Sequence, residues 1–156
     1  MPINFKPKIG QILNCNYGLY PIDINGNVIP DRVDAHMPPE MIKQRLVIVL
    51  NGRLNNNSSI VVPLSTTKNE CKLSKGIHVE LESGLIADLK HFRSKTCWAK
   101  CDLVQTVSNN RLNKPILANR GRLSQCIPNK IVTLIQIAVI RSINANIFLV
   151  KDSISA

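Results

Sequence analysis

Runs of apolar residues along the chain predict a β-hairpin near its middle. Leu46–Leu50 is continuously apolar and is bounded by Arg45 and by Asn51-Gly52, which is typical of a strand buried on both faces. A second run, Ser59–Leu64, follows a polar turn rich in asparagine. We expect these two runs to pair as antiparallel strands, with Pro63 near a strand end or at an edge.

Three further segments have the composition of strands. Ile9–Tyr17 mixes β-branched and polar residues before Gly18, and Gly76–Leu81 alternates between apolar and polar positions. Cys97–Val107 is predicted as one strand in which Cys97, Ala99, Cys101 and Leu103 share one face. On the other face, Trp98, Lys100 and Asp102 would project together, with the Cα atoms of Lys100 and Asp102 about 7 Å apart.

The remaining pattern predicts one helix and one long loop. Apolar residues recur at helical spacing from about 128 to 143, and Pro128 suits the first turn of such a helix. Residues 18–40 are rich in Pro, Asp, Asn and Gly, and a loop of this length in a compact domain is usually functional or mobile. A small hairpin at Asn25-Gly26 is expected within it. Short strands followed by a helix favour a small bent antiparallel sheet or barrel capped by that helix.

Length and charge narrow the class of protein. The chain has 156 residues, which predicts a single domain spanning 1–156, and its hydrophobic content of 44% is that of a folded protein. Twenty basic residues against ten acidic ones give a net charge of +10, which favours an anionic partner. Nucleic acid, a membrane surface and an acidic protein all remain compatible with this charge.

Other sequence features argue against secretion, membrane insertion and metal binding. The amino terminus lacks the pattern of a secretory signal, so we expect a cytoplasmic protein. The longest apolar-rich stretch, Ile131–Ile143, is shorter than the ~20 residues of a membrane span. The five cysteines form no C-x-x-C pair and the three histidines have no ligand spacing, so neither a metal nor another cofactor is expected.

Several motifs resemble those of one family. Glu40 and Arg45 stand in the pattern E-x-x-x-x-R before the apolar run, and Val61-Val62-Pro63-Leu64-Ser65-Thr66 matches V-V-P-(I/L)-(S/T). Lys100-Cys101-Asp102 and the residues to Val107 resemble R-C-D-x-x-R-T-(I/V), and Ile127–Ile131 resembles the start of a last helix. Together these blocks resemble the MazF/PemK family of endoribonuclease toxins, in particular its PemK/Kid branch.

The resemblance implies a fold, an activity and partners. It implies an SH3-like barrel with a carboxy-terminal helix. Such a protein acts as a homodimer that cuts single-stranded RNA sequence-specifically and is silenced by an acidic antitoxin protein. Three departures are visible: Leu46 replaces the usual proline, Lys100 replaces arginine, and the loop at 18–40 is longer than usual. Lysine holds phosphate only as a point charge, whereas arginine does so bidentately, so the second departure bears on activity.

The resemblance also assigns candidate roles in a metal-independent cleavage by the ribose 2'-hydroxyl, which needs a base, an acid and positive charge near the phosphate. Asp102 is the candidate general base, Arg45 the phosphate stabiliser and possible acid, and Lys100 the electrostatic stabiliser or proton donor. Ser65 and Thr66 are candidate phosphate donors, and Glu40 either positions Arg45 or contacts RNA. Trp98 is a candidate to stack on a base, with core or dimer packing as the alternative.

Other interpretations stay open at this stage. Arg45 with Glu40, and Lys100 with Asp102, are also typical of exposed ion pairs that contribute ~0–1 kcal/mol. A protein that resembles the gyrase-inhibiting toxin CcdB would share the barrel without needing an acid and a base. A catalytically weakened RNA-binding domain is a further alternative, and Lys100 and Leu46 are the departures that favour it.

Overall fold

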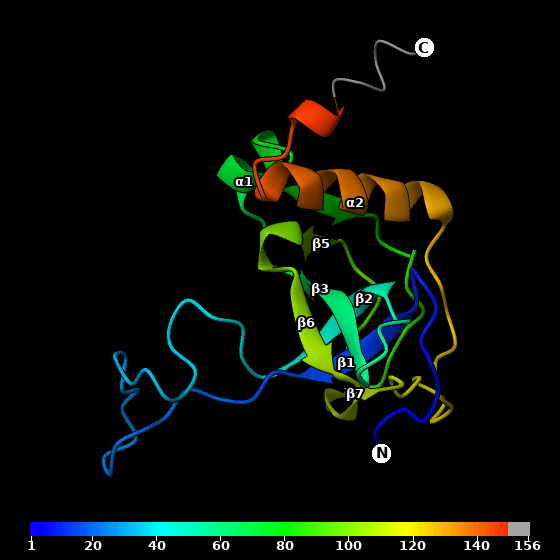
Figure 1. The fold of residues 1–156 in the computed structure, drawn as a ribbon. Helices are drawn as coiled ribbons and strands as arrows, with labels where there is room; N and C mark the ends of the chain where they lie inside the picture. Colours follow the sequence, from blue (N-terminus) through cyan, green and yellow to red (C-terminus); the bar gives the residue numbers. More distant parts are fainter. Residues whose placement is uncertain (150–156) are drawn as a thin grey trace.

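The computed structural model describes residues 1–149 as a bent antiparallel sheet with a helix packed across one side (Figure 1). The strands are β1 (Ile12–Asn16), β2 (Gln44–Asn51), β3 (Ser58–Ser65), β4 (His78–Leu81), β5 (Cys97–Lys100), β6 (Gln105–Ser108) and β7 (Leu112–Asn113). The helices are α1 (Glu70–Ser74) and α2 (Asn129–Ser142), with 3-10 turns η1 (Cys101–Leu103) and η2 (Asn109–Arg111). Residues 150–156 of the expected single domain lie outside this description.

The strand order confirms the predicted fold class. The strands follow the order β4-β5-β3-β2-β1-β7, and β6 pairs with β3 beside this path. All these pairs are antiparallel, and the path does not close on itself into a complete barrel. In the part of the chain described, no helix combines the length and the apolar character that crossing a membrane requires.

The central hairpin forms as the apolar runs predict. β2 and β3 pair antiparallel with Val47 opposite Pro63 and Val49 opposite Val61. On its other side, β3 pairs with β6 through residues 58–61 and with β5 through residues 64–65. Pro63 therefore lies where the pairing on that side is interrupted, a position that tolerates its missing N–H.

The segment 97–107 is not one strand, contrary to the sequence-based prediction. β5 ends at Lys100, the chain turns through η1, and β6 starts at Gln105. The turn allows β5 to pair with β4 while β6 pairs with the opposite half of the bent β3. Asp102 lies in this turn, so it does not project beside Lys100 from a shared strand face.

Both faces of β2 are buried, as its continuous apolar sequence predicts. Ile48 belongs to a core under α2 that includes Ile12, Val62, Ile135 and Ala138. Residues of the opposite face form a second core: Leu13, Cys15, Tyr17, Val47, Val49, Val61, Val107 and Leu112. The helix begins after Pro128, close to the predicted start, and buries Val132, Ile135 and Ala138, whereas Leu134 and Ile143 of the expected apolar stripe are exposed.

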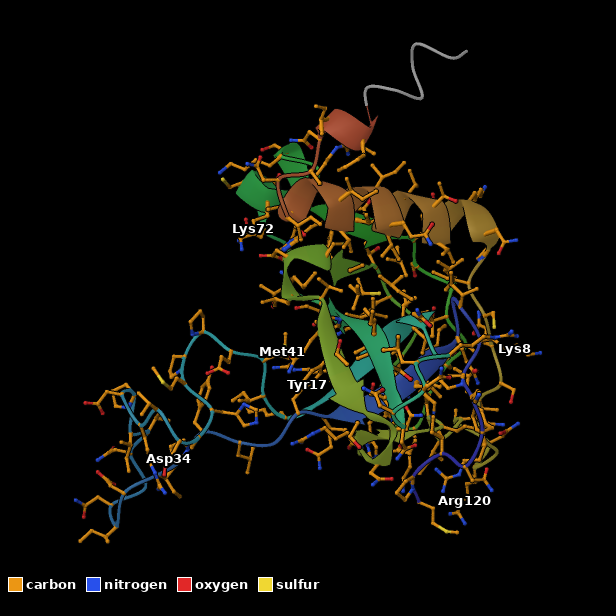
Figure 2. The ribbon with its side chains drawn as sticks, in the orientation of Figure 1. Lys8, Tyr17, Asp34, Met41, Lys72 and Arg120 are labelled. Atoms are coloured by element: carbon orange, nitrogen blue, oxygen red, sulfur yellow. The ribbon has the colours of Figure 1, made fainter. Side chains whose placement is uncertain are left out.

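The long loop between β1 and β2 is an arm that projects from the sheet (Figure 2). We define the arm as residues 18–43, because backbone bonds between Tyr17 and Lys43 and between Lys43 and Gly18 close its base. Asp34 lies near its outer end, and Met41 lies near its base. Within the arm, Ile22 and Val28 form an isolated bridge around Asn25-Gly26, which confirms the small hairpin predicted there.

Gly18 fixes how the arm leaves the sheet. Its φ of +87° is a left-handed conformation that side chains disfavour, and a Cβ at this position would lie 3.1 Å from the Nε2 atom of His36. The arm therefore folds back far enough to bring His36 over its own base.

Candidate functional site

Three predicted site residues line one groove at the ends of β2 and β3. This groove has a volume of about 800 Å³, and Arg45, Ser65 and Thr66 contribute to its wall. Apolar side chains and further cations complete the lining, among them Leu46, Leu64, Phe92, Arg93 and Lys95. No acidic residue of the described chain lines it, so the groove is suited to an anionic ligand with apolar parts.

Arg45 is held at the groove by the backbone. It is half-buried on β2, and its Nε donates a hydrogen bond of 3.3 Å to the Ile42 carbonyl. Glu40 does not pair with it within the described residues: the Glu40 carboxylate accepts a bond from the Met37 backbone N–H and lies 4.0 Å from His36. Glu40 therefore makes no direct contact with Arg45 among the described residues, and its two expected roles, positioning Arg45 and contacting RNA, stay predictions.

A second group of polar side chains surrounds Asp102. One carboxylate oxygen of Asp102 lies 2.7 Å from the His78 Nε2 atom, and the other accepts a bond from the Lys72 ammonium. The side chain of His78 is 3% exposed, that of Asp102 17% and that of Lys72 42%. Asp102 is thus anchored from the protein interior by His78 and held on its outer side by a lysine that water can reach.

These contacts set the charge states of the group. Burial raises the pKa of Asp102, but the hydrogen bonds from Lys72 and His78 outweigh it and hold that pKa below its usual range. Burial lowers the pKa of His78 even though Asp102 opposes this shift. His78 is therefore neutral at pH 7 and donates its Nε2–H to an ionised Asp102. Its other ring nitrogen, Nδ1, is buried with no hydrogen-bond partner among the described residues.

Residues 65–67 connect the groove to the Asp102 group. Ser65 and Thr66 line the groove, and the Lys100 ammonium donates a 2.9 Å bond to the Thr67 carbonyl. Burial lowers the pKa of Lys100, an effect that Asp102 partly opposes. Lys100 thus lies between residues 65–67, which include the hydroxyls of Ser65 and Thr66, and the carboxylate of Asp102.

Trp98 lies on β5 directly opposite Ser65 on one side and Glu80 on the other. Cross-strand partners share a sheet face, so Trp98 is on the same face as Ser65. It is half-buried, and its indole Nε1 is buried without a hydrogen-bond partner in the described chain. Stacking of Trp98 on a base stays a prediction.

Lys72 and His78 are site residues that the sequence did not single out. His78 stands in an alternating strand, where a surface or hydrogen-bonded histidine is the ordinary interpretation, and it is indeed hydrogen-bonded. Lys72 lies on the short helix α1, which Asn69 caps through the Lys72 backbone N–H. Lys72 lies 30 positions before Asp102 and His78 lies 24 positions before it, and no spacing motif in the sequence marks contacts over such separations.

The His78–Asp102 pair predicts loss of stability in acid. The unfolded chain binds a proton on histidine near pH 6.5, whereas the folded chain resists it because the pKa of His78 is lowered. The free energy of unfolding should therefore fall as the pH drops below about 6.5, and Asp102 adds the same trend below about pH 4. Urea unfolding between pH 7.5 and 5 should show this decrease, and His78→Gln should make it shallower.

His91→Gln is the matched control, because His91 is exposed at the groove. Equal pH slopes for the wild type and His78→Gln would contradict the assignment.

Comparisons with known proteins agree with the motifs. The family model for PemK-like, MazF-like toxins of type II toxin–antitoxin systems matches residues 26–142. The uncharacterised protein YifN of Escherichia coli K12 is 55% identical over 145 residues, which cover 93% of this chain and 97% of YifN. An uncharacterised Haemophilus influenzae protein is 38% identical over 146 residues, with 94% of this chain and 96% of that protein covered.

The fold is also found among solved structures. A mycobacterial endoribonuclease, determined in complex with its cognate antitoxin, superposes with a TM-score of 0.51 at 13% sequence identity. The match covers 88% of this chain and 95% of that one. At this identity the likeness concerns the fold.

Proposed function

The chain belongs to the family of PemK-like, MazF-like toxins of type II toxin–antitoxin systems, and we propose that it is an endoribonuclease that cuts single-stranded RNA without a metal. The observation that carries this proposal is the segment 65–67, which joins a cationic groove to an acid–base group. RNA in the groove would have its phosphate near Arg45 and its reacting ribose toward Asp102.

Asp102 is the base in this proposal. Its lowered pKa keeps it ionised at neutral pH, and one oxygen is committed to the buried His78. The other oxygen faces Lys72, whose side chain is 42% exposed and can exchange its partner for a phosphate. Asp102 then takes the proton of the 2'-hydroxyl as the 2'-oxygen bonds to the phosphorus.

Lys100 and Arg45 act on the phosphate and the leaving group. As the bond from phosphorus to the 5'-oxygen breaks, that oxygen needs a proton, and Lys100 is a better donor than arginine because burial lowers its pKa. Arg45 offsets the negative charge that builds on the phosphate oxygens. The products would be a 2',3'-cyclic phosphate and a 5'-hydroxyl end.

We propose two protein partners as well. The net charge of +10, and a groove that no acidic residue within 1–149 lines, favour an acidic antitoxin segment that competes with RNA for the same surface. A homodimer is proposed from the family relationship.

The direct test is incubation of the purified protein with a defined single-stranded RNA in EDTA, followed by mapping of the new ends. We expect fragments with 5'-hydroxyl and cyclic phosphate ends, and growth arrest when the protein is produced in cells. Growth arrest without RNA cleavage would favour a non-enzymatic inhibitor that resembles CcdB. RNA binding without cleavage would favour a catalytically weakened RNA-binding domain.

Binding of RNA should weaken steeply with salt. Each phosphate contact to a single strand contributes a slope of about −0.7 to the log–log plot of affinity against salt. Arg45, Arg93 and Lys95 at the groove predict a slope of about −2 for a non-cleavable RNA. Fluorescence titrations should show it, and Arg93→Gln should reduce it by about 0.7.

The control for this measurement is Lys130→Gln, which removes an exposed cation on α2 outside the groove lining. A flat salt dependence for the wild type would contradict electrostatic binding, and equal effects of the two variants would place the RNA elsewhere.

A further inference from the structure

Two asparagines lie side by side in the wall of the groove. Asn14 of β1 is directly opposite Asn113 of β7, and also directly opposite Leu46 of β2. Continuing the β2–β3 register from Val47 and Pro63 places Leu46 opposite Leu64. Because directly opposed residues share a sheet face, the two amides and the two leucines form one row across four strands. All four residues line the groove.

The amides of this row have free hydrogen-bonding capacity. Asparagine is depleted in strands, and other asparagines of this chain are used structurally: Asn69 caps α1, and Asn109 accepts a bond from Ser59. Within residues 1–149, no hydrogen bond involves the side chain of Asn14 or of Asn113. Each is half-buried and offers both a donor and an acceptor to the groove.

The surroundings of the amides match the chemistry of a nucleotide. A nucleobase has apolar faces and a hydrogen-bonding edge, and its backbone carries an anionic phosphate on each side. Leu46, Leu64 and Phe92 supply apolar surface, while Arg93 and Lys95 supply exposed positive charge at the same groove. Its volume of about 800 Å³ is within the range of small-molecule sites and therefore admits one nucleotide.

We propose that this groove holds one unpaired RNA base against Leu46, Leu64 and Phe92, and that Asn14 and Asn113 select it by hydrogen bonds to its edge. The two asparagines are then specificity-determining residues, separate from the Asp102 group that performs the chemistry. The inference rests on the proposed function, because it assigns a subsite to the RNA cleaved there.

The experiment compares sequence preference in two formats. Cleavage ends are sequenced from a random single-stranded RNA pool, and binding is selected from a matched 2'-deoxy pool that the proposed chemistry leaves intact. We compare the wild type, Asn14→Asp and Asn113→Asp, each of which replaces the amide donor with an acceptor. Asn55→Asp, in an exposed turn, is the control for the added negative charge. Thermal melts establish that each variant is folded.

The wild type and Asn55→Asp should prefer one base at a fixed position relative to the cut. A bidentate amide–base contact predicts that either groove variant changes this preference by about 10-fold. Should Asn14→Asp fail to fold, Asn113→Asp carries the test, since β7 has only two residues at the end of the strand order.

The outcomes separate this inference from the proposed function. Cleavage with a base preference that both groove variants retain overturns the inference and leaves the nuclease proposal intact. Absence of cleavage in the random pool overturns the nuclease proposal. In that case the binding selection from the 2'-deoxy pool still tests whether the groove selects a base. If the wild type enriches one base from the 2'-deoxy pool and the groove variants lose this enrichment, the subsite is supported. If the wild type binds the pool without any base preference, the subsite is overturned.

Discussion

Asp102→Asn and Arg45→Ala are each expected to lower the rate of RNA cleavage by about 10²–10³-fold. The amide of the Asp102→Asn variant would retain a hydrogen bond to His78 but would lack the charge that takes the proton. The Arg45→Ala variant would lack the guanidinium that offsets the phosphate charge. Neither side chain belongs to the apolar cores, so both variants should fold. Initial cleavage rates on a defined RNA and growth arrest on induction measure the loss.

Matched changes away from the site are Asp31→Asn in the exposed arm and Arg53→Ala, which lines a different cavity. Both controls should cleave RNA at the wild-type rate. If the two site variants are folded by thermal melts and still cleave as fast as these controls, the roles assigned to Asp102 and Arg45 are wrong.

A single 2'-deoxynucleotide on the 5' side of the cut should abolish cleavage at that position. The proposed nucleophile is the neighbouring 2'-oxygen, which is already held close to the phosphorus, and no other nucleophile is assigned at the site. Loss of one neutral hydrogen-bonding hydroxyl should weaken binding by no more than about 10-fold. Cleavage assays with the deoxy and the all-ribose substrate, together with titrations of both, separate chemistry from binding.

The same assay tests the role of metal ions. EDTA should leave the rate on the all-ribose substrate unchanged. Cleavage that persists on the deoxy substrate, or activity that EDTA removes and magnesium restores, would contradict attack by the 2'-hydroxyl.

The fold was predictable where local sequence and tertiary context agree. The apolar run from Leu46 and the run ending at Leu64 predicted the central hairpin, and Pro128 marked the start of α2. The break at η1 was not predictable, because Cys101 and Leu103 continue the alternation and no glycine or proline interrupts it. That break follows from the switch of β3 between two partner strands, which sequence periodicity does not encode.

The candidate site likewise has a part that the sequence predicted and a part that only the structure shows. The motif blocks pointed to Arg45, Ser65 and Thr66, and the structure brings these three to one groove. The prediction of one continuous strand over Cys97–Val107 placed the side chains of Lys100 and Asp102 next to each other. In the structure the direct partners of Asp102 are Lys72 and His78. Such contacts depend on how α1 and β4 pack against η1, so they require the three-dimensional structure.

The arm should open at a lower free-energy cost than the sheet from which it projects. None of residues 18–43 is buried, and the bonds that shape the arm are mostly local, such as those from the Asn25 and Asn27 backbone to the Asp23 carboxylate. Local stability follows buried contacts, so opening the arm costs far less free energy than unfolding the strands. A ligand that covers the arm can therefore remodel it while β1 and β2 stay paired and Asn14 keeps its position. Arg45 would respond to such a change, because its Nε binds the Ile42 carbonyl at the base of the arm.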